Sequence, residues 1–325
     1  MSARPCGAAV ALLPVPLSDE VPCLSRAKDV GQMMPVRLRC LRAIVAGMLG
    51  VMAGAIAAFG GAAAAEIQTQ PWPSRVQAVY AVSFAGLNIG TFEFNSVVTG
   101  TGYHLTGRAH LSALLGAFEW QGNTRAQGML ASGMPRPNSY AFDFRSNTKA
   151  GQIKMSFADN KVTGVLAQPP MPTSASAVPL KDSHLQDVLD PLSAIMALAG
   201  AQGGRARGVN ACGRRLSVFD GKQRFDLVMS YKGQSKVSEA QPSGQPNIVY
   251  VCRVRYVPLA GHVANEESKA MAQELGIEIW LRPVPNAGLL VPYQVVIPTA
   301  MGPATLTSQK VEITTQGQGQ IAFIY

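Results

Sequence analysis

The sequence predicts an all-β fold, a large antiparallel β-barrel that is open or spiral, with a short helix as its plug or lid. The chain of 325 residues is 47% hydrophobic and only 14% charged, and it contains 32 Gly and 22 Pro. Apolar and polar residues alternate in many short segments, and turn-forming residues recur about every ten positions. This combination is typical of strands joined by turns and argues against a long-helix or a disordered protein.

The N-terminal region has the pattern of a secretory signal peptide. Arg37, Arg39 and Arg42 precede an apolar run over residues 43–59, and small residues continue to Ala65. We therefore expect cleavage near Ala65 and a single β-rich periplasmic domain over residues 66–325. An uncleaved anchor is the alternative for the apolar run.

The true start of the chain is a separate question, because Met33 and Met34 are both suitable initiators. Either start would make residues 1–32 an upstream extension, and we assign that segment no fold.

The charge of the exported part limits its partners. Residues 1–65 hold six of the 28 basic and three of the 19 acidic residues, so 22 bases and 16 acids remain, a net charge near +6. No cluster of Lys and Arg with interleaved aromatic residues occurs, which argues against nucleic-acid binding. No second apolar run of spanning length follows residue 65, so we expect a mature chain that does not span a membrane.

The alternating segments give about fourteen strands. Before the long Pro/Ser-rich loop at residues 168–179 we expect strands at 76–84, 88–98, 103–111, 118–127, 140–146, 152–157 and 161–165. Residues 128–137 are rich in turn formers and are expected to be a connection. The apolar residues 112–117 are expected to form a short helical turn or a lip over the sheet. Later strands are expected at residues 247–257, 277–281, 289–297, 304–314 and 321–325.

One helix is well defined by its ends. Asp190 is a suitable N-cap, Pro191 occupies the first helical position, and Gly200 supplies a stop. Leu192, Ile195, Met196 and Ala199 recur at helical spacing between them. A second short helix is expected at residues 265–275.

A β-hairpin is predicted around Asp220-Gly221, because this dipeptide favours a two-residue type I′ turn. A loop of that length pairs Phe219 with Lys222, Ser217 with Arg224 and Arg215 with Asp226 on a solvated face. The other face, which carries Leu216, Val218, Phe225 and Leu227, is expected to join the core.

Export leaves Cys212 and Cys252 as the cysteines of the mature chain, since the other three of the five precede residue 65. Two cysteines in an oxidising compartment favour a disulfide. A redox or metal-binding pair is the alternative, but it lacks the Cys-x-x-Cys spacing and a neighbouring histidine.

Several segments resemble the exported bacterial proteins that carry domain-of-unknown-function family 3108. The resemblance rests on residues 190–194 (DPLSA), 218–227 (VFDGKQRFDL) and 252–261 (CRVRYVPLAG), with support from residues 80–90 and 288–292. It implies a periplasmic β-rich fold similar to the open or spiral barrels of envelope lipoprotein carriers and envelope-integrity factors. It implies no biochemical activity.

The sequence contains no residue that we would assign as catalytic, cofactor-binding or metal-binding. Asp182, His184, Asp187 and Asp190 are the sharpest candidate cluster, but they also fit a polar loop whose last Asp caps a helix. Arg215, Arg224, Arg253 and Arg255 are expected to share an outer sheet face. Six residues are candidates for lining an apolar ligand cavity, although they would equally fill a core: Trp120, Leu192, Ile195, Met196, Tyr250 and Tyr256.

These observations favour a non-enzymatic periplasmic envelope protein that binds a lipid, another apolar ligand or an envelope protein and supports envelope integrity. The alternative is a periplasmic hydrolase or modifying enzyme that acts on cell-wall or glycan substrates. No cofactor is expected for the non-enzymatic envelope protein, and the sequence does not indicate an oligomeric state.

Overall fold

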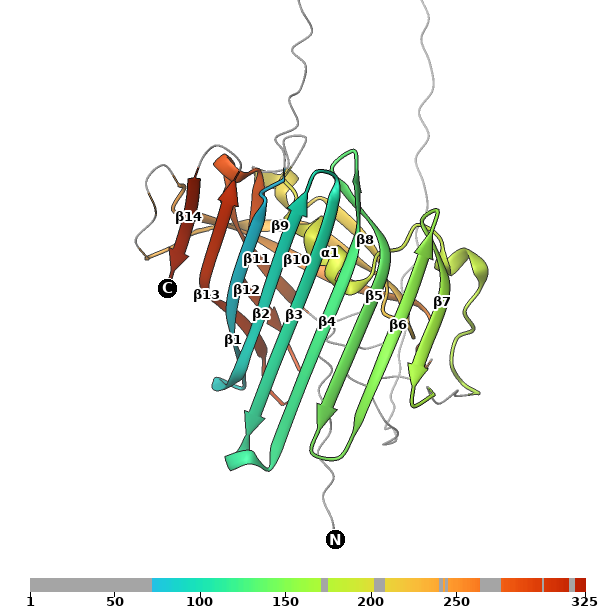
Figure 1. Ribbon diagram of the computed structural model, residues 1–325. Helices are drawn as coiled ribbons and strands as arrows, with labels where there is room; N and C mark the ends of the chain where they lie inside the picture. The colour runs from blue at the N-terminus through green and yellow to red at the C-terminus, as the bar shows by residue number, and fades with distance from the viewer. Residues whose placement is uncertain are drawn as a thin grey trace, which may run out of the picture. The chain divides into compact units, whose positions relative to one another are not determined.

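The computed structural model describes residues 72–170, 175–201, 208–239, 242, 245–263, 276–299, 301–315 and 319–325. Across these residues the chain forms one antiparallel sheet of fourteen strands and one α-helix (Figure 1). The strands before the helix are β1 (Arg75–Phe84), β2 (Leu87–Thr99), β3 (Gly102–Ala113), β4 (Phe118–Ala131), β5 (Met134–Ser146), β6 (Ala150–Ala158) and β7 (Lys161–Gln168). The later strands are β8 (Arg214–Phe219), β9 (Arg224–Lys236), β10 (Ile248–Ala260), β11 (Ile277–Val284), β12 (Leu289–Ile297), β13 (Ala304–Thr315) and β14 (Gly319–Ile324).

The sheet runs in the order β7-β6-β5-β4-β3-β2-β1-β13-β12-β11-β10-β9-β8, and β14 pairs with β13. Its edges, β7 and β8, do not pair with each other, so the barrel is open, as the sequence predicts. The segment before the helix hydrogen-bonds to both edges: the Asp187 amide donates to the Asn160 carbonyl (2.7 Å) and the Leu189 amide to the Ser217 carbonyl (2.9 Å).

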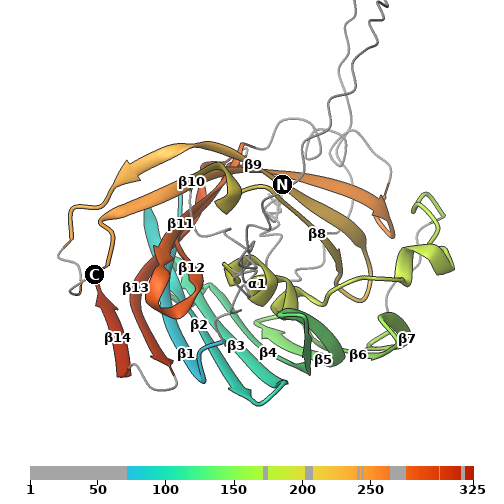
Figure 2. The same ribbon diagram turned by 90° about the horizontal axis from the view of Figure 1, so that it is seen from above.

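The helix α1 (Pro191–Ala199) lies inside the curve of the sheet. Figure 2 shows it between the wall made by β2 to β5 and the arch made by β8 to β10, and it packs against strands of both. Along β1 to β5 the more buried side chains largely alternate with the more exposed ones, which is the period expected for half-buried strands. The plug position agrees with the expectation from the sequence. The second expected helix, at residues 265–275, lies outside the described residues.

Two strands continue through the region expected to be a connection. β4 extends to Ala131 and β5 begins at Met134, so the prediction of a turn over residues 128–137 was wrong. Pro135 and Pro137 are tolerated because β6 pairs with β5 only from Ser139 onward. Their missing amide hydrogens therefore break no ladder on that side.

The predicted two-residue hairpin turn is also wrong. Phe219 pairs with Arg224, which leaves residues 220–223 as the loop, and Ser217 pairs with Asp226. The Asp220 carboxylate sets this longer turn by accepting hydrogen bonds from the amides of Lys222 (2.8 Å) and Gln223 (2.6 Å). The observed pairing register of the hairpin differs from the predicted register by two residues. Each side chain therefore stays on the side of the sheet that was predicted for it.

The C-terminal strand β14 is held to the sheet through a buried arginine. Arg282, on β11, is 1% exposed, and its guanidinium lies 4.8 to 5.1 Å from the ring centres of Tyr293, Phe323 and Tyr325. Such cation–π contacts are strengthened by burial. They join β11, β12 and the end of the chain.

Candidate functional site

The inner side of the sheet is the candidate site, and α1 is its fixed centre. Asp190 caps the helix as predicted: its Oδ1 accepts hydrogen bonds from the amides of Leu192 and Ser193, each at 3.0 Å. Ser193 Oγ donates to Asp190 Oδ2 (2.5 Å) and lies 2.8 Å from Tyr103 Oη on β3. At the other end Arg214 donates to the carbonyls of Ala197 and Leu198. Both ends of the helix are thus fixed to the sheet.

Burial raises the pKa of the Asp190 carboxyl to about 6, although hydrogen bonds from Ser193 and Leu192 oppose the shift. A raised pKa in the folded state means that this group favours folding fully below pH 4 and loses that contribution as the pH rises through 6. We expect the loss to be about 3 kcal/mol, and Asp190→Asn to abolish it while keeping the cap.

The measurement is urea unfolding at several pH values between 4 and 7. The wild type should lose stability relative to Asp190→Asn across this window, whereas parallel pH profiles would contradict the assignment. Asp190→Ala serves as the comparison that lacks the cap.

Two rows of inner-face side chains lie beyond the helix, toward the β1–β2 and β3–β4 turns. The contacts of α1 with β3 fall at Tyr103 and Gly107. The next rows along the ladder define what we call the inner belt: Tyr80, Val82, Phe92, Ala109, Leu111, Trp120 and Phe144. Every member belongs to or packs on the hydrophobic core, and none carries a formal charge.

The lengths of the helix and the strands explain why the helix does not cover this belt. The nine residues of α1 span about 14 Å, whereas the thirteen residues of β2 span about 40 Å. The helix therefore covers only part of the inner face along the strands.

The six predicted ligand residues lie in this same interior. Five are buried (Trp120, Leu192, Met196, Tyr250 and Tyr256) and Ile195 is half-buried against the core. Leu192 packs over Gly107, and the Trp120 ring lies over Gly122, where a Cβ atom would come within 2.3 Å of it. The ring centres of Tyr256 and Phe225 lie 5.0 Å apart with the rings tilted by 41°, and the Tyr256 hydroxyl donates to Gln223 Oε1 (3.0 Å). Trp120 belongs to the belt, while the helix residues border it.

The acidic loop before the helix does not form a cluster. Lys161 pairs with Asp182 (3.2 Å), Arg136 lies 3.7 Å from Asp187, and the His184 ring accepts from the Lys181 amide. Asp190 is buried at the cap. Over the described part of the chain, no three His, Cys, Asp or Glu side chains are placed to hold a metal ion.

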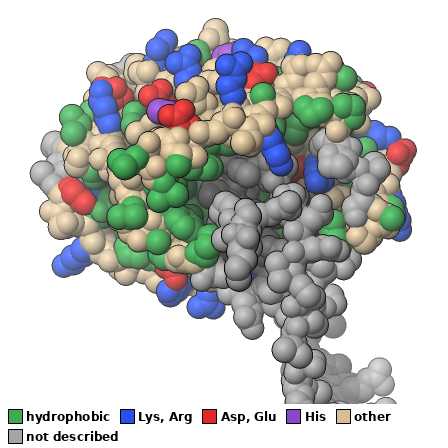
Figure 3. All heavy atoms as spheres, turned by 90° about the horizontal axis from the view of Figure 1, so that it is seen from below, with side chains coloured by type: hydrophobic (Ala, Val, Ile, Leu, Met, Phe, Trp, Pro, Cys, Tyr) green, Lys and Arg blue, Asp and Glu red, His purple; other side chains and the backbone are tan. Residues whose placement is uncertain are grey.

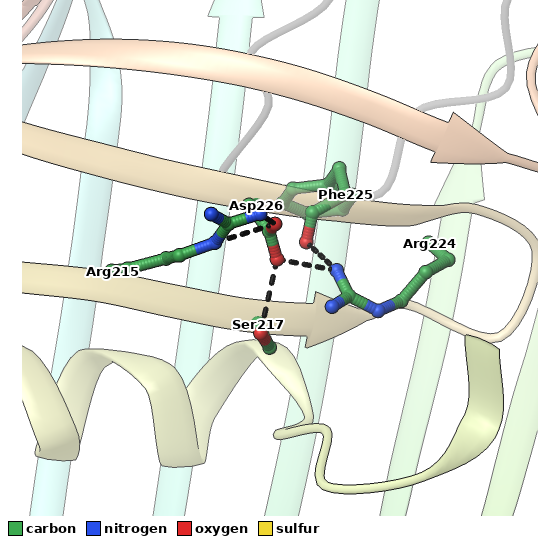
Figure 4. Close-up of polar contacts among 5 residues, drawn as sticks. All are labelled: Arg215, Ser217, Arg224, Phe225 and Asp226. Atoms are coloured by element: carbon green, nitrogen blue, oxygen red, sulfur yellow. Dashed lines mark hydrogen bonds and ion pairs between the residues drawn. The ribbon is translucent and has the colours of Figure 1, made fainter. Parts of the chain in front are cut away.

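The hairpin carries the most concentrated charge near the site (Figure 4). Asp226 is 1% exposed and accepts hydrogen bonds from Arg215 Nε (2.8 Å), Ser217 Oγ (3.0 Å) and Arg224 (2.7 Å). Burial by itself would raise the pKa of Asp226, but the hydrogen bonds from Arg224 and Arg215 outweigh it and hold the pKa below its ordinary value. The expected Arg215–Asp226 ion pair is confirmed, but as a diagonal contact.

The predicted solvated face of the hairpin was wrong near the turn, because Phe219, Arg224 and Asp226 are buried. Arg215, Arg253 and Arg255 do lie on the outer face: Arg215 and Arg255 both pair with Val228 across β9, and Arg253 pairs with Ser230. Arg224 is separated from them by burial and by its ion pair with Asp226.

The cysteine pair is confirmed as a disulfide. Cys212 and Cys252 are bonded, with Cα atoms 5.4 Å apart, and both are fully buried. The bond ties the segment that enters the edge strand β8 to β10, two strands inward.

No helix in the described ranges is long and apolar enough to cross a membrane. The predicted signal peptide and its expected cleavage near Ala65 lie outside the described residues.

Comparison with known proteins gives one match. A family model described as a protein of unknown function (DUF3108) matches residues 79–309, which is more than half of the chain. No curated protein and no solved structure matches. The matched range runs from β1 to β13 and contains the helix, the inner belt and the disulfide. The chain therefore belongs to the DUF3108 family.

Proposed function

We propose that this chain is an exported, non-enzymatic protein of the cell envelope that binds an apolar ligand with a long hydrocarbon chain against the inner belt. The observation that supports this proposal is the uncharged belt beyond the reach of α1. Ligand sites of this kind are concave, mainly apolar and lined by aromatic side chains. The leader-like residues before position 66 and the disulfide support export.

The openness of the sheet supports the same proposal. A closed barrel of this size would leave access only at its ends, whereas β7 and β8 share no ladder and, in the described part of the chain, residues 186–189 bridge them. We infer that α1, the one α-helix among the described residues, leaves the belt to be covered by a ligand.

Tryptophan quenching tests the proposal, because the chain contains three Trp, at 72, 120 and 280. The full chain with Trp72→Phe and Trp280→Phe retains only Trp120, in the belt. We expect saturable quenching of its fluorescence by dibrominated stearate, reversed by unbrominated stearate.

The matched control retains only Trp280. This residue is half-buried, and its indole donates to Glu278 outside the belt (3.3 Å). Equal quenching of the two tryptophans, or none of Trp120, would refute binding at the belt. Native mass spectrometry of protein from its own host would then identify the natural ligand.

A further inference from the structure

The end of the sheet that carries the β1–β2, β3–β4 and β12–β13 turns exposes large apolar side chains. Leu87 is 72% exposed, Leu114 81%, Leu115 108%, Phe118 43% and Met301 52%. The register places all three turns at one end, and the Ala85 amide donates to the Pro303 carbonyl (2.9 Å), which joins two of them. We call these five residues the apolar tip.

Figure 3 looks onto this end of the molecule. Hydrophobic side chains gather on it inside a margin of Lys, Arg, Asp and Glu side chains. Single exposed apolar residues are common on proteins, but a gathered set marks an interaction surface.

The backbone holds the tip in a disfavoured conformation. Leu114 and Leu115 have φ of 53° and 55°, in the left-handed region that leucine rarely adopts. Both side chains are exposed, so no core packing compensates for this conformation. Other tight turns of the chain also have positive φ, at Ala85, Ser132, Asp159 and Asn160, so the turn geometry imposes it, but here two exposed leucines occupy the position.

The tip is also rigidly supported by the neighbouring turn. Asn147 Oδ1 accepts from the Glu119 amide (2.6 Å), and its Nδ2 donates to the Gly116 carbonyl (3.3 Å). Asn147 thus ties the second half of the β3–β4 turn, from Gly116 to Glu119, to the β5–β6 turn. The same β5–β6 turn exposes two basic residues, Arg145 and Lys149.

We propose that the apolar tip inserts into the headgroup region of an anionic bilayer, with Arg145 and Lys149 against the lipid phosphates. Three separate turns projecting from one end suit a fluid medium better than a shaped protein groove. Apolar insertion combined with basic flanks is the way peripheral proteins bind anionic membranes. This proposal does not depend on a ligand at the inner belt.

Vesicle flotation of the full chain tests the proposal, with phosphatidylcholine vesicles that contain a minority of phosphatidylglycerol. Leu114→Asn with Leu115→Asn should lower binding by at least about tenfold. The thermal midpoint should stay equal or rise, because asparagine tolerates the left-handed conformation better than leucine.

Val209→Asn is the matched control, since Val209 is 63% exposed but lies in a short turn that contacts β9 and β10, neither of which carries a tip residue. Val209→Asn should bind vesicles like the wild type. Arg145→Gln with Lys149→Gln should weaken binding to the vesicles that contain phosphatidylglycerol but not to vesicles of phosphatidylcholine alone. If the double leucine variant fails to fold, Leu115→Gly removes one of the same side chains at a position where glycine is favoured.

A wild type that does not bind vesicles, or tip variants that bind vesicles as well as the wild type, would overturn the proposal. A wild type that instead self-associates through the tip would also do so.

Discussion

Reduction of the Cys212–Cys252 disulfide is expected to lower the free energy of unfolding by about 4 kcal/mol. The two cysteines are separated by 40 positions in the sequence, and the bond restricts the unfolded chain over that loop. The chain-entropy relation for a loop of this length gives about 4 kcal/mol. We expect β8 to detach before the other strands when the disulfide is reduced, because an edge strand pairs with a neighbour on one side only.

Urea unfolding of the oxidised and the reduced wild type measures this difference without changing any side chain. The dependence of the free energy on urea should steepen on reduction, because the uncrosslinked chain exposes more surface when it unfolds. Cys212→Ala with Cys252→Ala should behave like the reduced protein and be insensitive to reductant. Equal stabilities of the oxidised and reduced forms would show that the loop is not restricted as proposed.

Asp226→Ala is expected to cost about 3–5 kcal/mol, the loss typical when one partner of a buried ion pair is removed. Arg224 would remain 8% exposed and without the carboxylate to which it donates. Because the folded pKa of Asp226 is lowered, its contribution is present above the unfolded pKa and is lost as the pH falls through the folded value. The difference between the wild type and the variant should therefore begin to shrink below about pH 4 and disappear only below the lowered folded pKa.

Asp143→Ala is the control for this prediction. Its partner Arg125 is at 3.3 Å, but the two side chains are 44% and 61% exposed, so the loss should be under about 1 kcal/mol. Replacing both charges, with Arg224→Met and Asp226→Leu, should recover much of the stability, because no unpaired buried charge remains. Similar losses from Asp226→Ala and Asp143→Ala would mean that burial adds nothing to the Asp226 pair.

The hairpin illustrates what local sequence signals can and cannot predict. Alternation assigned Leu216, Val218 and Phe225 to the core, and they are buried. The turn length was wrong because the Asp220 carboxylate competes for the amides of the turn. Moreover, Gly221 packs against Ile153 of β6, a contact that local sequence does not reveal.

The interior site was predictable only in part. The residue types and spacing of α1 identify the helix, its cap at Asp190 and its apolar residues. The hydrogen bond between Tyr103 and Ser193 spans 90 positions, and the inner belt combines residues from five strands. Such groups come together only when the sheet register is known.

The sequence by itself determined the all-β class, the short capped helix and the cysteine pairing, because strand alternation, capping chemistry and the cysteine count are local or compositional properties. It also identified the family. Only the tertiary structure decided that the opening of the sheet lies between β7 and β8, that Asp226 is buried, and that the apolar turn at residues 114–116 projects outward. These features depend on which distant strands become neighbours and on what then covers each side chain, and long-range packing alone determines both.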